Sequence, residues 1–166
     1  MGAELLFAVG MVAAAGWDLA ARRIPNALSA TILFFGIVNG SLTGGVVGIG
    51  GAVLGALVGL AVLLPLFHVR WIGAGDVKLL SAVGAWVGAG GVLWVTIGGL
   101  ALGGLVSAAM LADPALRREV VDNLKTAALV LEAPVAPRRS KRQLVPMAVA
   151  FAVAAVGFVA VNGGLS

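Results

Sequence analysis

Two aspartates in this sequence have the residue type and placement for acid–base chemistry. Asp18 follows the first long apolar run, and Asp76 precedes the fourth, directly behind glycines 73 and 75. Two carboxylates that lie close together at low dielectric repel each other and therefore tend to share one proton. The ionised carboxylate then accepts a proton from water, while the protonated one polarises a peptide carbonyl. Such a pair would hydrolyse a peptide bond.

The composition predicts a membrane protein. Of the 166 residues, 61% are hydrophobic and 11% are charged, whereas a soluble domain has about 25% charged residues. We therefore expect an all-α, polytopic integral membrane protein, with one membrane-embedded domain over residues 1–166. The chain has no cysteine and a single histidine, His68, which excludes disulfides, cysteine-ligated zinc and a thiol nucleophile. We expect neither a metal ion nor another cofactor.

Apolar runs separated by glycine and proline predict six transmembrane helices. Pro25 breaks the chain after the first run, and Asn26 or Ser29 is expected to cap the helix that follows. Glycines at positions 51, 55 and 59, and again at 99 and 103, form stripes on which neighbouring helices can pack. The segment at about 113–143 is polar, with apolar residues at helical spacing, and predicts a cytoplasmic interfacial segment. The six helices are expected at about 3–17, 27–42, 46–67, 77–87, 92–112 and 144–161.

The basic residues predict the orientation in the membrane. With six helices, all 11 Lys and Arg residues fall on one side, and the connections at 41–45 and 88–91 have none. The positive-inside rule makes the basic side cytoplasmic and places both termini outside. Because Asp18 ends the first helix and Asp76 begins the fourth, both are expected at the cytoplasmic edge of the membrane.

Each aspartate also has a structural interpretation. Asp76 would cap the helix that it opens, and Asp18 would pair with Arg22 one helical turn away. Taken singly, these interpretations are favoured. However, apart from Glu4, Asp18 and Asp76 are the only acidic residues outside the 113–132 segment, and both are expected at the same depth. Their pairing favours a joint role.

The sequence around both aspartates resembles a known family. Trp17-Asp18-Leu19 with Arg22-Arg23-Ile24-Pro25-Asn26, and Gly73-Ala74-Gly75-Asp76-Val77-Lys78-Leu79-Leu80, resemble the prepilin peptidases, also called type IV leader peptidases. The Gly-x-Gly-Asp motif alone is shared with presenilin-type proteases, but the extended form is more specific. The resemblance implies a six-helix aspartic endopeptidase of the cytoplasmic membrane, with Asp18 and Asp76 as its catalytic pair. It would cut the short leader from prepilin or pilin-like precursors on the cytoplasmic side.

Several further expectations accompany this resemblance. Gly73 and Gly75 would leave space for an extended substrate backbone, and Lys78 would orient the substrate, favour an ionised aspartate or extend to the membrane interface.

The resemblance also concerns a second activity. Larger family members have a cysteine-containing segment associated with methyltransferase activity, and we do not expect that activity in this chain. Val145-Pro146 resembles another family element, but Met147-Ala148 replace the usual Tyr-Gly, so no site role is assigned to them. The expected partners are the precursor protein and membrane lipids, with the Arg138–Arg142 cluster contacting anionic lipid, and nucleic acid is not expected.

Two other classes of protein remain open as alternatives. A small transporter or channel subunit could use a buried aspartate pair to relay protons or bind a cation. A structural assembly protein would explain the glycine stripes but would leave the two aspartates without a role. The helix middles are almost wholly apolar, and this favours the peptidase.

Overall fold

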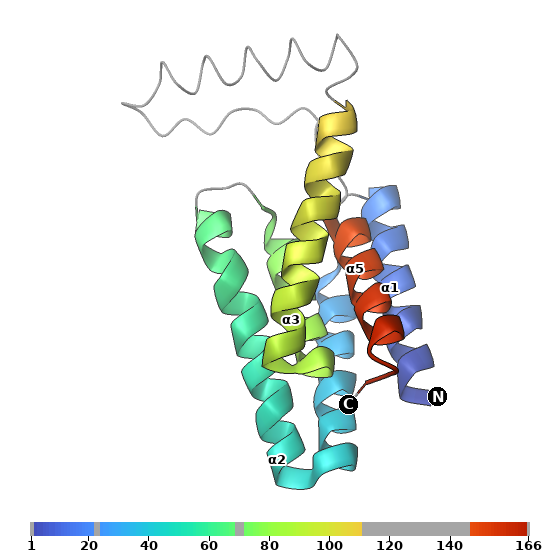
Figure 1. The fold of residues 1–166 in the computed structure, drawn as a ribbon, viewed down its shortest axis with the longest axis vertical. Helices are drawn as coiled ribbons and strands as arrows, with labels where there is room; N and C mark the ends of the chain where they lie inside the picture. The colour runs from blue at the N-terminus through green and yellow to red at the C-terminus, as the bar shows by residue number, and fades with distance from the viewer. Residues whose placement is uncertain (1, 22–23, 69–71, 111–146, 166) are drawn as a thin grey trace. The chain divides into compact units, whose positions relative to one another are not determined.

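The computed structural model describes residues 2–21, 24–68, 72–110 and 147–165 (Figure 1). Its contacts divide the chain into two units, one formed by Met1–Leu102 with Pro146–Ser166 and the other by Gly103–Val145. Within the described residues, the second unit contains only the last helical residues of one long helix, 103–110. All the packing and the candidate site described below belong to the first unit.

The described residues form helices and no strands. These are α1 (Gly2–Ala21), α2 (Asn26–His68), α3 (Ala74–Met110) and α5 (Met147–Val161). Among them, α1, α2 and α3 are long and apolar enough to cross a membrane, and α5 is a shorter apolar helix of 15 residues. The all-α prediction is confirmed for this part of the chain, whose apolar helices are those of a multi-pass membrane protein.

Two of these helices are interrupted at glycines. Gly45 in α2 has φ 57° and ψ −134°, and Gly88 in α3 has φ 72° and ψ 177°. Positive φ is accessible to glycine because it has no Cβ. At the first break the chain doubles back, since the backbones of Gly40 and Gly48 lie directly against each other. Both interruptions fall within the predicted connections at 41–45 and 88–91, and Figure 1 shows the reversal in each helix.

The helix ends differ from the predicted boundaries in ways that have local causes. The α1 helix continues to Ala21, beyond the predicted end at residue 17, because Leu19, Ala20 and Ala21 are good helix formers. The carbonyl oxygen of Pro25 accepts the first hydrogen bonds of the α2 helix, from the N–H groups of Leu28 and Ser29 at 3.1 and 3.3 Å. Pro25 therefore occupies the N-cap position. The expectation that Asn26 or Ser29 would be the N-cap is therefore wrong.

Close glycine contacts join α2 to α3. The backbones of Gly55 and Gly84 touch, and a Cβ on Gly59 would lie 2.5 Å from the carbonyl oxygen of Leu80. Small residues permit this approach because no side chain separates the two helices. At Gly51, the third glycine of the predicted stripe, an added Cβ would have no neighbouring atom within 4 Å. The stripe therefore packs a helix at two of these three positions.

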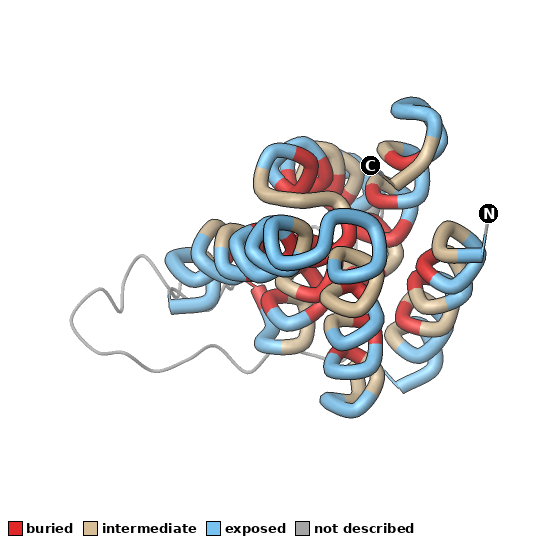
Figure 2. Tube along the Cα trace, turned by 90° about the horizontal axis from the view of Figure 1, so that it is seen from below, coloured by how far each residue is buried: buried red, intermediate tan, exposed pale blue. Residues whose placement is uncertain are grey.

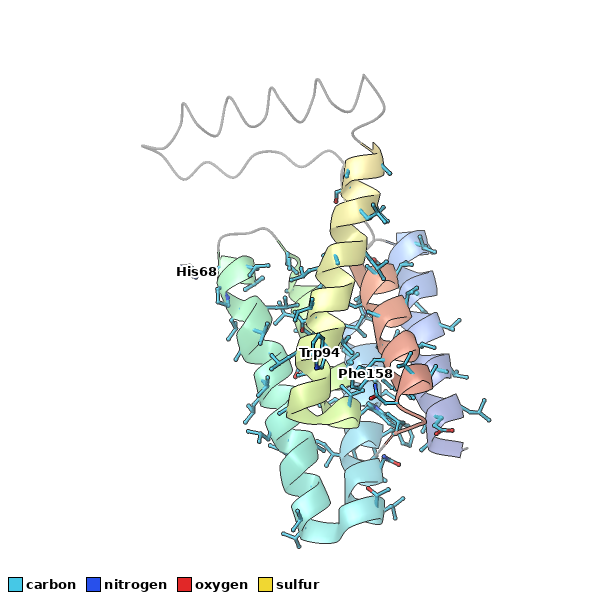
Figure 3. The ribbon with its side chains drawn as sticks, in the orientation of Figure 1. His68, Trp94 and Phe158 are labelled. Carbon is cyan, nitrogen blue, oxygen red and sulfur yellow. The ribbon has the colours of Figure 1, made fainter. Side chains whose placement is uncertain are left out.

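The α5 helix packs between α1 and the second half of α3. The ring of its Phe151 lies against Gly99, and the ring of its Phe158 lies against Gly91. Figure 3 labels Phe158 on this helix. It runs antiparallel to α1. Glu4, near the start of α1, lies beside Gly164, just beyond the end of α5, and Asp18, near the end of α1, accepts a hydrogen bond from the N–H of Ala148 at the start of α5.

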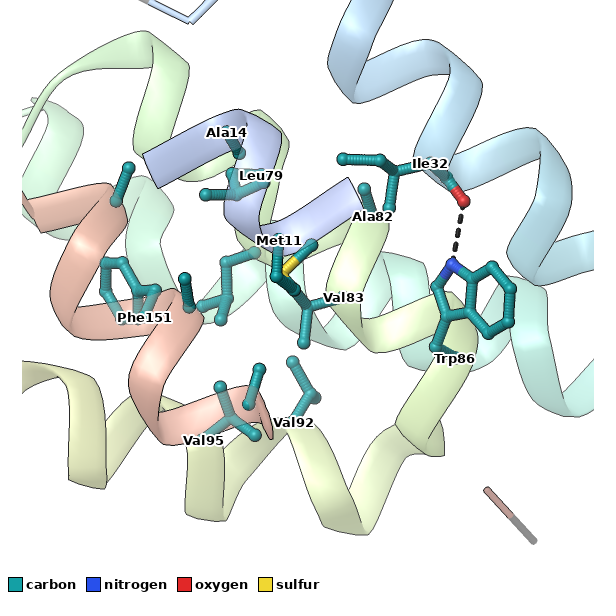
Figure 4. Close-up of a cluster of buried hydrophobic side chains, with 14 of the residues drawn as sticks. Met11, Ala14, Ile32, Leu79, Ala82, Val83, Trp86, Val92, Val95 and Phe151 are labelled. Atoms are coloured by element: carbon teal, nitrogen blue, oxygen red, sulfur yellow. Dashed lines mark hydrogen bonds between the residues drawn. The ribbon is translucent and has the colours of Figure 1, made fainter. Parts of the chain in front are cut away.

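The core lies where the inward faces of these helices meet. Figure 2 shows buried residues on the inner sides of the helices and exposed residues on the outer sides. The indole N–H of Trp86 donates a 2.8 Å hydrogen bond to the carbonyl oxygen of Ile32 within this core (Figure 4). Large apolar side chains such as Trp94, which is 67% exposed, cover the outer faces. Such outer faces suit a lipid environment.

Candidate active site

One end of the first unit collects the end of α1 and the starts of three other helices. Contacts link Asp18 near the end of α1 to the first turn of α5, and Asn26 at the start of α2 to the first turns of α3. A helix N-terminus has unpaired backbone N–H groups and a partial positive charge, and both stabilise carboxylates. This end of the molecule therefore suits the two aspartates.

Asp76 lies in the first turn of α3 and is half-buried. Its carboxylate Oδ2 accepts a hydrogen bond from the backbone N–H of Gly73 at 3.3 Å, while the carbonyl oxygen of Gly73 accepts the N–H of Asp76 at 3.2 Å. Asp76 thus supplies one half of a capping box, in which the third helical residue accepts the N–H of the residue before the helix, and Gly73 has no side chain to supply the other half. The expectation that Asp76 would be the N-cap of this helix is wrong, because α3 begins at Ala74, but its carboxylate satisfies a backbone N–H at the helix start and is held beside the Gly73–Gly75 turn.

Asp18 is also half-buried. Its Oδ2 accepts a hydrogen bond from the backbone N–H of Ala148, the second residue of α5, over 3.3 Å. In a helix, the N–H at this position has no intrahelical partner. The bond therefore satisfies an N–H group of α5 and holds the Asp18 carboxylate at the positive end of that helix. The alternative partner, Arg22, lies outside the described residues.

The structure brings the two aspartates together. The carboxylate of Asp18 is close enough to that of Asp76 to interact with it electrostatically, although the two residues are far apart in the sequence. Two half-buried carboxylates that repel each other can share one proton, because only one of them ionises readily. Each is held by a backbone N–H at the start of a different helix.

The sequence that forms this site matches a known protein family. Residues 5–108 match the type IV leader peptidase family. The chain belongs to this family. The matched residues include both aspartates of the pair and Lys78, whereas α5 lies beyond them.

Named relatives extend the comparison. The chain is 38% identical over 93 residues to the protein named prepilin leader peptidase/N-methyltransferase in Aeromonas hydrophila, and equally to the protein of that name in Aeromonas salmonicida. The aligned part is 52% of this chain and 32% of each relative. The chain therefore matches about a third of the length of these leader peptidases. No solved structure matches the chain.

The three supporting residues expected for a leader peptidase occupy different environments. Gly73 is exposed and forms the capping interaction with Asp76. Gly75 faces Ile24, whose side-chain atoms would lie 3.5–3.6 Å from an added Cβ. Lys78 is exposed, and its Nζ donates a 2.9 Å hydrogen bond to Oδ1 of Asn26.

Within the described residues, no group of three or more histidine, aspartate and glutamate side chains is placed to hold a metal ion. His68, the last residue of α2, is exposed (Figure 3). The structure does not describe Arg22, Arg23, Arg70 or the predicted interfacial segment at 113–143, which includes the whole Arg138–Arg142 cluster.

Sequence reasoning missed two residues of this site. Ala148 was given no role because Met147-Ala148 depart from the family pattern, but its contribution is a backbone N–H that any residue except proline supplies. Asn26 was expected to cap α2 and instead accepts the bond from Lys78. The one-sided basic residues did indicate where Ala148 lies, since they predict the start of the last helix at the same membrane edge as Asp18.

Proposed function

We propose that this chain is a membrane aspartic endopeptidase that removes the short leader from prepilin or pilin-like precursors, with Asp18 and Asp76 as its catalytic pair. The observation that carries the proposal is that these half-buried carboxylates interact electrostatically while a backbone N–H at a helix start holds each of them. Membership of the type IV leader peptidase family supports the same reaction. The proposal treats residues 1–166 as one peptidase domain and assigns it no methyltransferase activity.

The two carboxylates divide the work of hydrolysis. The ionised aspartate takes a proton from a water molecule, whose oxygen attacks the scissile carbonyl carbon, and the protonated aspartate donates its proton to the carbonyl oxygen. The tetrahedral intermediate then loses its C–N bond as a proton passes to the leaving amine. The released products are the leader, with a new carboxyl end, and the mature protein, with a new amino end.

The helix lengths support six crossings of the membrane. An unbroken α2 of 43 residues would be about 65 Å long, twice the hydrocarbon thickness of about 30 Å. The reversal at Gly45 divides it into two segments of crossing length, 26–44 and 46–68, and the break at Gly88 divides α3 into a shorter segment, 74–87, and one of crossing length, 89–110. The one-sided basic residues support a location of the catalytic pair at the cytoplasmic face of the inner membrane, where a precursor would meet it before export.

The transporter alternative has less support. A proton or ion path through a helix bundle needs polar or ionisable groups along its length. Among the described residues, the buried polar side chains are Ser29 and Thr96, and the hydroxyl of Thr96 is bonded to the carbonyl oxygen of Val92 in its own helix. These two groups do not form a path away from the aspartates.

Leader cleavage by full-length protein in liposomes tests the proposal, with a pilin-like precursor as substrate and mass spectrometry as the readout. Asp18→Asn and Asp76→Asn should each lower the rate by at least about a hundredfold, because an amide cannot share a proton as a carboxyl pair does. The double variant should be no worse than either single variant, since residues of one catalytic unit are strongly non-additive.

Glu4→Gln is the matched control, because Glu4 lies on α1 at the opposite end from Asp18. This variant should retain normal cleavage. Asparagine is itself a good capping residue, so purely structural aspartates would tolerate the change. Substantial cleavage by either Asp→Asn protein would therefore refute the aspartic mechanism.

A further inference from the structure

Lys78 makes a contact that its place in the sequence does not reveal. Its Nζ lies 2.9 Å from Oδ1 of Asn26, the first residue of α2. Lys78 is two residues beyond Asp76, and residues two apart on a helix do not face each other. The side chain of Lys78 is therefore directed to the start of α2 rather than to the neighbouring carboxylate.

A second contact joins the same two segments. Ile24 packs against Gly75, with three of its side-chain atoms 3.5–3.6 Å from the position of an added Cβ. Ile24 and Asn26 thus both touch the turn that carries Asp76, one through apolar packing and one through the bond to Lys78. These contacts join the start of α2, which follows α1 and Asp18 along the chain, to the segment that carries Asp76.

The polar contact contributes little to overall stability. Lys78 and Asn26 are both exposed, and exposed polar pairs change stability only slightly because water replaces either partner. Their hydrogen bond nevertheless crosses between two helices, whereas the exposed bond of Thr31 to the carbonyl oxygen of Ala27 stays within α2. The effect of losing the Lys78 bond is therefore expected on the relative position of α2 and α3.

We propose that Lys78 is a positioning residue, which acts through Asn26 to hold Asp76 in register with Asp18. This inference rests on the proposed function, because it assigns Lys78 a part in aspartic catalysis without contact to the substrate. Loss of the hydrogen bond between Lys78 and Asn26 would let the start of α3 separate from the start of α2. The two carboxylates would then meet less often, while substrate binding would persist.

Kinetics of the full-length protein in liposomes test this role. Lys78→Met removes the donor and Asn26→Ala removes the acceptor, and each should lower kcat about tenfold with KM within about twofold. The double variant should equal the single variants, because one contact is lost in all three. Asn26→Asp keeps an acceptor for Lys78 and should restore kcat to within about threefold. Thr31→Val, which removes the bond internal to α2, should behave like the parent protein.

A second measurement does not depend on activity. The chain has no natural cysteine, so Asp18→Cys and Asp76→Cys introduce the only two thiols. A short thiol-specific cross-linker should join them efficiently, and adding Lys78→Met or Asn26→Ala should reduce the yield severalfold. Thr31→Val should leave the yield unchanged.

The outcomes separate this inference from the proposed function. A raised KM with unchanged kcat in Lys78→Met, together with normal kinetics in Asn26→Ala, would mean that Lys78 binds substrate and would overturn the inference. Unchanged cross-linking in both variants would overturn it as well. If the Asp→Asn proteins still cleaved precursor, the aspartic mechanism would fail, and the cross-linking yields would still decide whether Lys78 positions the two segments.

Discussion

The backbone N–H of Ala148 donates a hydrogen bond to the carboxylate of Asp18, linking the start of α5 to the end of α1 across 3.3 Å. The two residues are separated by most of the chain. The contact means that the last helix takes part in the candidate active site through its main chain, although the family match ends at residue 108.

Replacing this donor should impair catalysis. Ala148→Pro removes the N–H, and proline is tolerated in the first turn of a helix because that N–H has no intrahelical partner. A hydrogen bond to a charged group contributes about 1.5–3 kcal/mol, so leader cleavage should fall roughly tenfold to a hundredfold. The measurement is the initial cleavage rate at equal protein concentration in liposomes.

Ala148→Gly is the control for this substitution. It keeps the N–H and removes only the methyl group, at a cost of about 1 kcal/mol in helix propensity. Its cleavage rate should stay within a few-fold of the parent protein. Equal rates for the proline and glycine variants would show that the bond to Asp18 does not matter for the reaction.

The orientation of the helices predicts which positions are accessible from outside the cell. Ala21 ends α1 and Asn162 follows α5, and both are exposed. In a chain without natural cysteine, Ala21→Cys and Asn162→Cys each provide one thiol for a membrane-impermeant reagent. In intact cells Asn162→Cys should react and Ala21→Cys should not, because the positive-inside rule puts Ala21 in the cytoplasm. Labelling of Ala21→Cys before the membrane is opened would contradict the topology.

The glycine contact between α2 and α3 predicts a clear difference within one helix. An added Cβ at Gly55 would overlap the backbone of Gly84, and neither backbone can move aside easily. Gly55→Ala should therefore destabilise the protein by about 1–3 kcal/mol, as overpacking does in other cores. The readout is the thermal unfolding midpoint in detergent.

Gly51→Ala is the matched control, since Gly51 lies one turn earlier on the same helix and has open space around it. There the added methyl group should raise the midpoint slightly, because alanine is the better helix former. A similar loss in both variants would mean that helix propensity, rather than contact with Gly84, controls the result.

Much of the site's placement could be predicted from the sequence, because hydropathy and charge determine which helix ends share a membrane face. This reasoning brought Asp18 and Asp76 to one edge, and the structure places them within electrostatic reach. The glycine clusters also marked the reversals at Gly45 and Gly88, where backbone conformation favours that residue. The signals for these features are local.

The features that were missed depend on contacts between distant segments. The Lys78–Asn26 bond joins residues 52 positions apart, and a cap on α2 was the simpler local expectation for Asn26. The end of α1 was predicted at residue 17 because hydropathy marks the membrane edge, whereas helix propensity carries the helix to Ala21. The open surroundings of Gly51 could not be foreseen, since its spacing matches that of Gly55 and Gly59.

The backbone contact of Gly55 with Gly84 also limits axial sliding. Two helices separated by side chains can shift along each other as rotamers adjust, but touching backbones have no such compliance, and a shift of one residue would bring Ala56 or Ala85 into the contact. Asp76 lies eight residues before Gly84 on the same helical segment, about 12 Å along the axis. The depth of this carboxylate in the membrane is therefore set within the bundle, at a contact remote from the reaction.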